Sequence, residues 1–294
     1  MQKIKIVTDT ASDITVKEAE SLDICLLPFK VVLNNNEYRE SYDFSTEEFY
    51  KMLEESESIP SHSQITPFEY SEAIGNIANE GYDHIVIVPI NQNGSSTFQS
   101  AVNARMQFLN ENPDTTVKIH IVNTLTYSGG YGYPVKKAAE MAKSNGNIDE
   151  IFSFFEDWFS RFELFFTTFD LKYAKESGRV GKASAIAGEL LGIKPIIDLS
   201  AGNSITYKKA RGIPKALEIL VETVKERIGE DKKYLFIYGN NEEEYKELKK
   251  TMKKQFHADM LDATRLGACI AVNAGPLAIG IGFLGEKRDM QVIY

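Results

Sequence analysis

Residues 4–13 read IKIVTDTASD, and this stretch sets the pattern for the chain. Its first half is strand-like, and its second half is a turn of small residues that carry hydroxyl and carboxylate groups. Comparable hydroxyl-rich turns occur at residues 61–66, 94–97 and 123–130. In open parallel sheets, ligands lie beyond the carboxyl ends of the strands, where such loops converge. The four turns therefore predict one shared binding site for a polar group.

The turn at residues 61–69, SHSQITPFE, also carries the signals of a helix start. Thr66 is a good N-cap, a proline follows it, and a glutamate three residues further on completes a capping box. His62, Ser63 and Gln64 place an imidazole, a hydroxyl and an amide just before that helix. Because helix N-termini carry unpaired N–H groups and a partial positive charge, this chemistry suits a carboxylate or a phosphate. A capped surface helix with no ligand is the alternative that these residues leave open.

Up to about residue 160, apolar runs alternate with helical patterns. The strand-like runs lie at residues 3–8, 25–33, 84–90 and 117–122, and the helical patterns at 45–57, 66–80, 96–110, 129–144 and 148–161. Such alternation is typical of βαβ units, so we expect a mainly parallel sheet with helices on both faces. The aromatic side chains of the last helix are expected to pack in the core.

From residue 164 the pattern changes, because hairpins are mixed with crossover connections. Strands are expected at 164–169, 193–199, 204–209, 234–239, 258–265, 269–273, 279–284 and 290–294, and helices at 171–176, 182–191, 213–228 and 242–255. This mixture predicts a second domain with a mixed sheet and helices. We therefore expect an α/β protein of two α/β domains, residues 1–160 and 161–294.

Composition excludes several classes of function. The formal net charge of −9, with no run of Lys and Arg, argues against a nucleic-acid-binding surface. The two cysteines, Cys25 and Cys269, lie far apart in apolar surroundings, so we expect core residues and not a disulfide or a metal pair. No apolar stretch is long enough to span a membrane, and no signal peptide is recognisable. We expect a soluble cytoplasmic protein with no metal and no cofactor.

Six short motifs, in series, resemble the DegV family. They are VTDTASD (7–13), SQITP (63–67), SSTFQSA (95–101), LKYAKESGRVGK (171–182), LGIKP (191–195) and GPLAIG (275–280). The resemblance implies a carrier and not an enzyme. Such a protein holds a long-chain fatty acid between its domains, with the second domain closing over the acyl chain. It resembles the fatty-acid-binding subunits that present the carboxylate to a separate fatty acid kinase.

The resemblance also implies roles for individual residues. Ser95 matches the serine that bonds the carboxylate, and Ser63 and Gln64 match the neighbouring loop of that site. The residues expected to support the site are Ser96, Thr97, Thr66, Ser128 and Gly129. Arg179 and Arg211 match arginines that could face the partner.

Two positions depart from the family pattern. His62 stands where the family commonly has threonine, and Asn273 stands where it commonly has a histidine that touches the carboxylate. Asparagine can donate a hydrogen bond from its amide but carries no charge. We expect Asn273 to contribute to the carboxylate site and His62 to supply an imidazole from the opposite loop.

Two other functions are compatible with the sequence. A small hydrolase could use Ser63 or Ser95 as nucleophile with His62 and Asp9, although no G-x-S-x-G elbow is present. A regulatory protein that binds a partner and holds its lipid only for structure is the other alternative.

Overall fold

A computed structural model of the 294-residue chain describes residues 2–144, 146–179 and 192–294. Its N-terminal sheet is parallel throughout, with the strand order β2-β1-β6-β7. The strands are β1 (Ile4–Asp9), β2 (Ile24–Leu27), β6 (His84–Val88) and β7 (Lys118–Ile121). All five residues of β6 are buried, as expected for a central strand that is covered on both faces.

The second large sheet is mixed and has the strand order β10-β9-β8-β13-β11-β12. Its strands are β8 (Phe162–Thr168), β9 (Ile193–Asp198), β10 (Ile205–Arg211), β11 (Lys233–Tyr238), β12 (Asp259–Arg265) and β13 (Ala278–Leu284). Only β11 and β12 pair in parallel, and the other neighbours are antiparallel. The predicted fold class, a parallel and a mixed α/β region, is therefore confirmed.

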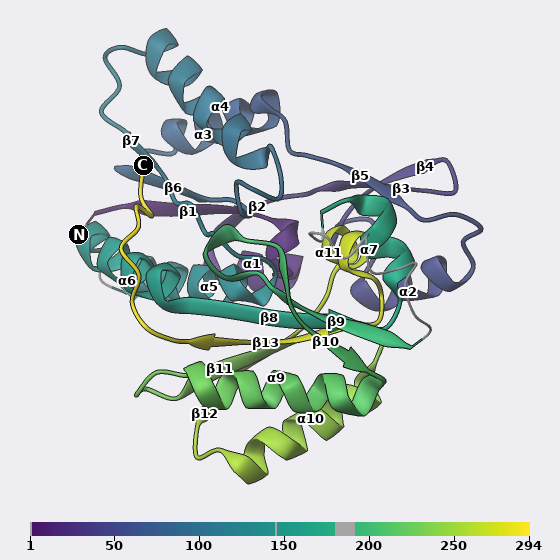
Figure 1. The fold of residues 1–294 in the computed structure, drawn as a ribbon. Coiled ribbons are helices and arrows are strands. Elements are labelled where there is room, and N and C mark those ends of the chain that lie inside the picture. The colour runs from purple at the N-terminus through teal and green to yellow at the C-terminus, as the bar shows by residue number, and fades with distance from the viewer. Residues whose placement is uncertain (1, 145, 180–191) are drawn as a thin grey trace.

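The two sheets and their helices form five layers (Figure 1). Helices α3 (Pro67–Asn79) and α4 (Thr97–Glu111) cover the outer face of the parallel sheet. The layer between the sheets contains α1 (Val16–Leu22), α5 (Gly129–Ser144) and α6 (Ile148–Arg161). The outer face of the mixed sheet is covered by α9 (Ile213–Arg227) and α10 (Glu242–Gln255). Helix α5 contacts both sheets, so the central layer joins the two halves.

A smaller unit lies at one end of these layers. It contains the antiparallel sheet β4-β3-β5, formed by β3 (Lys30–Leu33), β4 (Asn36–Arg39) and β5 (Ser61–Ser63), and three helices, α2 (Thr46–Glu54), α7 (Leu171–Ser177) and α11 (Ala268–Ala274). The side chains of α2, α11 and β3 share one hydrophobic cluster. Residues from the two ends of the sequence are thus packed together here. Short 3-10 helices, η1 (Thr10–Ser12) and η2 (Ser200–Gly202), complete the described elements.

The capping signals explain where several helices begin. Thr66 Oγ1 accepts a hydrogen bond from the Glu69 N–H at 3.3 Å, and the Glu69 carboxylate accepts from the Thr66 N–H at 2.8 Å. Thr15 and Ser45 form equivalent capping boxes at the starts of α1 and α2. The helix predicted at residues 66–80 is therefore confirmed, together with its cap.

Some predicted elements are wrong or differ in form. The run at residues 25–33 forms two strands in different sheets, because Pro28 lies between them and has no N–H for a ladder. Residues 269–273 lie in helix α11 and not in a strand; a short apolar run buried on all sides does not distinguish the two. No apolar run marks β4 or β5, whose side chains are mostly exposed. The helix predicted at residues 182–191 lies outside the described residues.

Residues 290–294 return to the N-terminal sheet instead of forming a strand. They extend along the edge of β7, where Ile121 and Tyr294 exchange two hydrogen bonds of 3.0 and 2.8 Å. The Asn123 N–H also donates to the Val292 carbonyl oxygen at 2.7 Å. These bonds attach the segment that follows the mixed sheet to the parallel sheet.

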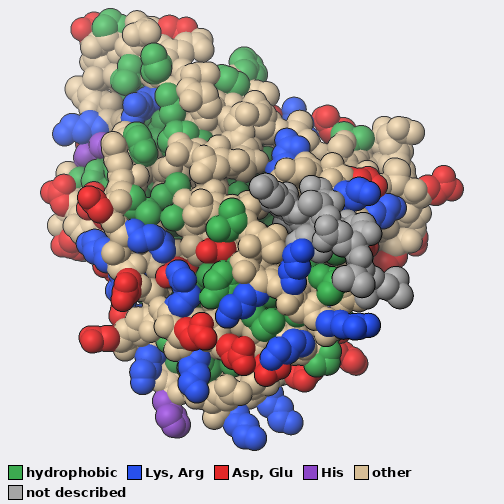
Figure 2. All heavy atoms as spheres, in the orientation of Figure 1, with side chains coloured by type: hydrophobic (Ala, Val, Ile, Leu, Met, Phe, Trp, Pro, Cys, Tyr) green, Lys and Arg blue, Asp and Glu red, His purple; other side chains and the backbone are tan. Residues whose placement is uncertain are grey.

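One face of the molecule shows a mixed distribution of charge (Figure 2). Lys and Arg side chains lie between Asp and Glu side chains over the part of this face that contains β10 and α9. Such an arrangement is typical of a solvated surface, because neighbouring opposite charges cancel the field at a distance.

The close approach of α5 to η1 yields a first prediction. A Cβ atom at Gly132 would lie 2.2 Å from the carbonyl oxygen of Ser12, so we expect Gly132→Ala to lower the free energy of unfolding by about 1–3 kcal/mol. Gly75 on α3 has no neighbouring atom within 4 Å of such a Cβ. Gly75→Ala is therefore the matched control and should be neutral or stabilising by up to ~1 kcal/mol. Urea denaturation measures both, and equal effects would contradict the prediction.

Candidate functional site

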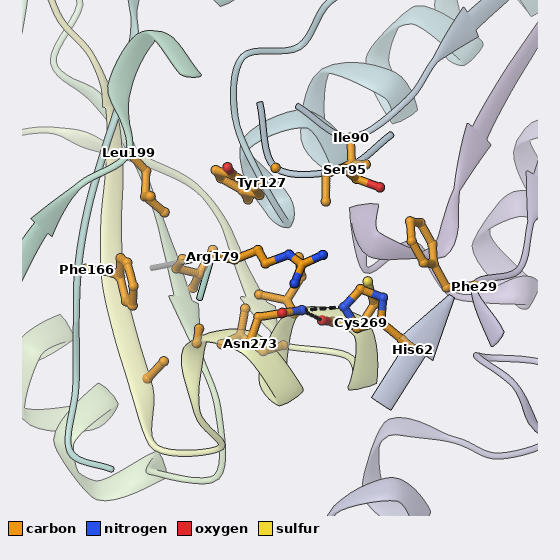
Figure 3. A pocket seen from close by; sticks show the side chains of 16 residues that line it. Phe29, His62, Ile90, Ser95, Tyr127, Phe166, Arg179, Leu199, Cys269 and Asn273 are labelled. Carbon is orange, nitrogen blue, oxygen red and sulfur yellow. Dashed lines mark hydrogen bonds between the residues drawn. The ribbon is translucent and has the colours of Figure 1, made fainter. Parts of the chain in front are cut away.

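A cavity of about 60 Å³ lies between the parallel and the mixed sheets (Figure 3). Most of its wall is apolar and comes from both halves of the chain. The apolar lining residues are Phe29, Ile90, Phe166, Leu199, Ile237, Leu266, Ile270, Ala274 and Ala278. The polar side chains of Ser95, His62, Asn273 and Arg179 also line it. The cavity is therefore amphipathic, with the composition expected of a site for a molecule that has a long apolar part and a small polar group.

Ser95 reaches the cavity from the loop between β6 and α4. Its Oγ lies 2.9 Å from Thr97 Oγ1 and accepts a hydrogen bond from the Thr97 N–H at 3.2 Å. This contact provides a side-chain cap for the start of α4, which Ser96 does not. Thr97 is buried beneath Ser95, and Ser96 is exposed. Of the predicted residues in this turn, only Ser95 lines the cavity.

His62 and Asn273 meet across the cavity wall. His62 lies on β5 and Asn273 near the end of α11, and Asn273 Nδ2 lies 2.7 Å from His62 Nε2. Asn273 Nδ2 also donates to the carbonyl oxygen of Cys269 at 2.6 Å. Burial, together with the nearby positive charge of Arg179, lowers the pKa of His62 below its usual value. The two positions that depart from the family pattern are therefore in direct contact.

Arg179 extends its guanidinium group toward the polar side of the cavity (Figure 3). It follows Gly178, whose φ of +64° ends α7 in the left-handed conformation. Its Nη1 donates to the carbonyl oxygen of Ser177 at 2.9 Å. Arg211, at the end of β10, is exposed and does not line this cavity. That either arginine faces a partner stays a prediction.

The remaining predicted residues lie elsewhere. Ser63 and Gln64 are exposed and are not part of the cavity lining, although they neighbour His62. Thr66 caps α3. Ser128 is fully buried and donates to the carboxylate of Asp13, and Gly129 packs closely against Thr264. The structure thus brings the turns containing His62 and Ser95 to the cavity. The turn containing Asp13 lies at a second place, and the turn at residues 123–130 reaches both, because Tyr127 lines the cavity and Ser128 contacts Asp13.

That second place is a cluster of three carboxyl groups, the buried Asp9 and Glu40 and the half-buried Asp13, which adjoins the start of α11. Asp13 Oδ1 accepts from the Gly267 N–H at 2.9 Å, and Glu40 Oε1 accepts from the Cys269 N–H at 2.8 Å. A Cβ atom at Gly267 would lie within 2.8 Å of both carboxylates, so this close approach requires glycine. The cluster holds the beginning of the helix that carries Asn273.

Asp9 is the most enclosed member of the cluster. Its oxygens accept from the Tyr131 hydroxyl at 2.5 Å and from the N–H groups of Ala11 and Ile90 at 3.1 and 2.9 Å. Burial, with a contribution from the negative charge of Glu40, raises the pKa of Asp9 to about 7. Burial also raises the pKa values of Asp13 and Glu40. In the described ranges, none of the three forms an ion pair with a basic side chain.

Several residues of the cavity and of the carboxyl cluster were not predicted from the sequence. Tyr127 lines the cavity, and its hydroxyl accepts from Asn91 Nδ2 at 2.9 Å. Cys269, expected in the core, is buried and also lines the cavity. Glu40 lies in no motif, and the only available signal was an acidic residue that follows a short polar strand.

Within the residues that the structure describes, no group of acidic, His and Cys side chains could hold a metal ion, and no helix is long and apolar enough to cross a membrane.

Comparisons with known proteins agree with this architecture. A family model described as "Uncharacterised protein, DegV family" matches residues 3–286. A Thermotoga maritima relative named "Fatty acid-binding protein" is 27% identical, covering 97% of this chain and 100% of the relative. A solved DegV family structure from Thermus thermophilus, described by its fatty acid binding, has a TM-score of 0.83 at 26% identity and covers 97% of this chain and 100% of that one.

A third similarity concerns the fold alone. The Fatty Acid Kinase (Fak) B3 protein of Streptococcus pneumoniae, solved with linoleic acid, has a TM-score of 0.79 at 18% identity. The match covers 97% of this chain and 100% of that one. The two solved structures therefore share the overall fold of this chain.

The pKa of Asp9 predicts how stability changes with pH. Because the folded-state value of about 7 exceeds the unfolded value of about 3.9, the native state binds the extra proton between these pH values. The Asp9 contribution to the free energy of unfolding should therefore fall as the pH rises from about 4 to 7, by up to ~1.4 kcal/mol per pH unit.

Urea denaturation of wild type and Asp9→Asn at pH 5 and pH 8 tests this expectation. Asp9→Asn should cost more stability at pH 5 than at pH 8, because only the wild type gains from protonation. The exposed Asp114 supplies a matched control, and Asp114→Asn should leave the pH profile of the wild type unchanged. An Asp9→Asn effect of equal size at both pH values would be inconsistent with a protonated Asp9.

Proposed function

We propose, on the premise that this chain belongs to the DegV family, that it binds a long-chain fatty acid in the cavity between its two sheets and presents the carboxylate to a separate fatty acid kinase. The observation that carries the proposal is the amphipathic cavity, in which an apolar wall adjoins the polar side chains of Ser95, His62 and Arg179. An acyl chain and a carboxylate have the same two kinds of surface. The relatives named for fatty acid binding support this ligand class.

The polar groups have complementary parts in the proposed complex. Arg179 supplies the positive charge, because the lowered pKa of His62 keeps its imidazole neutral near pH 7. Ser95 supplies a hydroxyl donor at the N-terminal end of α4, where the helix dipole also favours negative charge. Asn273 acts through its contact with His62. Ser63 and Gln64 form the rim next to His62 in this proposal.

The two halves of the chain supply different parts of the cavity lining. Residues 1–160 supply Ser95 and His62, whereas residues 161–294 supply Arg179 and most of the apolar wall. We propose residue 160 as the domain boundary on this basis. The central layer of helices then joins the two domains and keeps the two sides of the cavity together.

The ligand must enlarge the cavity. A volume of about 60 Å³ is small beside sites for drug-sized ligands, which occupy about 300–1,000 Å³. Binding therefore requires apolar side chains of the two halves to separate. Each methylene group of the acyl chain that leaves water contributes about 0.8 kcal/mol, which can offset the cost of this separation.

The geometry does not favour the alternative of a serine hydrolase. A nucleophile and its base need a hydrogen bond of about 2.6–3.2 Å. Ser95 Oγ is instead paired with Thr97, and Ser63 is exposed outside the cavity. His62 Nε2 is occupied by Asn273. Among the described contacts, neither serine bonds His62.

The partner kinase is the finer part of the proposal. The similarity in fold to a protein that is named for a fatty acid kinase supports it. A protein that holds its lipid only for structure would bind the same ligand but would not support phosphate transfer. Acyl phosphate formation from bound oleate, with a candidate kinase and ATP, separates these two roles.

Native mass spectrometry of the protein purified from its expression host tests fatty acid binding directly. We expect one adduct per chain with the mass of a long-chain fatty acid, because the amphipathic cavity, once its walls separate, would hold one acyl chain. Denaturation should release it as a free acid. Protein that carries no adduct and gains none after incubation with oleate would refute the proposed ligand.

Arg179 should determine the preference for an acid over an alcohol. Hydrogen bonds to charged groups contribute about 1.5–3 kcal/mol, so Arg179→Gln should weaken oleate binding by about tenfold or more while oleyl alcohol binding changes little. Ser95→Ala should weaken oleate binding in the same direction. Arg211→Gln is the matched control, because Arg211 lies outside the cavity. Displacement of a fluorescent fatty acid measures these affinities. Equal losses for Arg179→Gln and Arg211→Gln would rule out a specific contact.

A further inference from the structure

We infer that Asn273 holds His62 as the neutral tautomer with its proton on Nδ1, and that this N–H is a donor to the carboxylate of the bound ligand. The inference rests on the proposed function and adds a positioning residue to it. In this inference the imidazole is a neutral hydrogen-bond donor to the carboxylate and not a charged partner.

The carbonyl oxygen of Cys269 fixes the orientation of the Asn273 amide. It lies 2.6 Å from Asn273 Nδ2, and a carbonyl oxygen can only accept a hydrogen bond. The nitrogen of the amide, and not its oxygen, must therefore face Cys269. The reverse orientation would place two oxygens in contact without a proton between them.

The same nitrogen then determines the state of His62. An amide nitrogen has two hydrogens, and the second is available to His62 Nε2 at 2.7 Å. Nε2 must be the acceptor in this contact, so it carries a lone pair and no proton. A neutral imidazole has one N–H, which is therefore on Nδ1. Protonation of Nε2 would place two donors against each other.

The surroundings of the ring favour the same state. His62 is partly buried, and the edge of the Phe29 ring packs against it with the ring centroids 5.8 Å apart. The charged group nearest in the cavity lining is the guanidinium of Arg179, which disfavours a second positive charge. An imidazolium is thus opposed by burial and by the positive charge of Arg179.

His62 Nδ1 is the atom that could donate a hydrogen bond to a ligand. It is buried and has no hydrogen-bond partner among the residues that the structure describes. A buried donor without a partner loses its hydrogen bonds to water and gains none in return. His62 lines the cavity, so a ligand oxygen that enters as the walls separate can become the missing acceptor.

Two variants of His62 distinguish its ring nitrogens. The side-chain amide of asparagine lies at the same number of bonds from Cβ as Nδ1, whereas that of glutamine reaches as far as Nε2. We expect His62→Asn to bind oleate within about threefold of the wild type and His62→Gln to bind about tenfold more weakly. The reverse order would overturn the assignment of the donor. Equal affinity of both variants and the wild type would mean that His62 only ties β5 to α11.

Nuclear magnetic resonance of the ¹⁵N-labelled, ligand-free protein tests the tautomer separately. The wild type should give the pattern of a neutral ring protonated at Nδ1 at pH 7, and Asn273→Leu should give a mixture of tautomers. A purely structural contact would not change the tautomer. A wild-type ring protonated at Nε2, or charged at pH 7, would overturn the inference. Because this measurement needs no ligand, a failure of oleate binding would refute the proposed function and leave the tautomer result intact.

Discussion

The fold depends on a contact between its two halves: backbone N–H groups at the start of α11 donate to the carboxylates of the half-buried Asp13 and the buried Glu40. Gly267 makes the contact possible, because any side chain there would collide with both acids. Without it, Asp13 and Glu40 would each lose a backbone donor, and the buried Glu40 would be left with an uncompensated cost in desolvation. The position of α11, and with it one wall of the cavity, follows from this constraint.

This arrangement separates two kinds of polar chemistry within a short distance along the chain. The first turn of α11 satisfies acids that function as structural acceptors, and the end of the same helix carries Asn273, which orients His62. Acids in the first group have raised pKa values through burial, whereas the pKa of the imidazole is lowered. Both shifts favour neutral groups, so Arg179 supplies the positive charge in the cavity lining.

Much of this architecture could be predicted from sequence. The alternation of apolar runs and capped helices predicts the parallel half, and the resemblance to the DegV family implies that Ser95 and Asn273 belong to one carboxylate site. Other features depend on tertiary contacts that no local pattern records. The apolar residues of α11 have no clear period because they are buried on all sides. The direction of Arg179 depends on the left-handed turn at Gly178, and Glu40 accepts from residues distant in sequence, the Thr10 hydroxyl and the Cys269 N–H.

The return of residues 292–294 to β7 has a consequence for biosynthesis. These residues are made about 170 positions after the strand they pair with, since β7 ends at Ile121. At translation speeds of about 5–20 residues per second, the edge of β7 is left unpaired for roughly 10–30 s. An unpaired edge is a template for intermolecular pairing. During this time the edge of the nascent parallel sheet can pair with neighbouring chains. The edge is covered only when residues 292–294 have been synthesised.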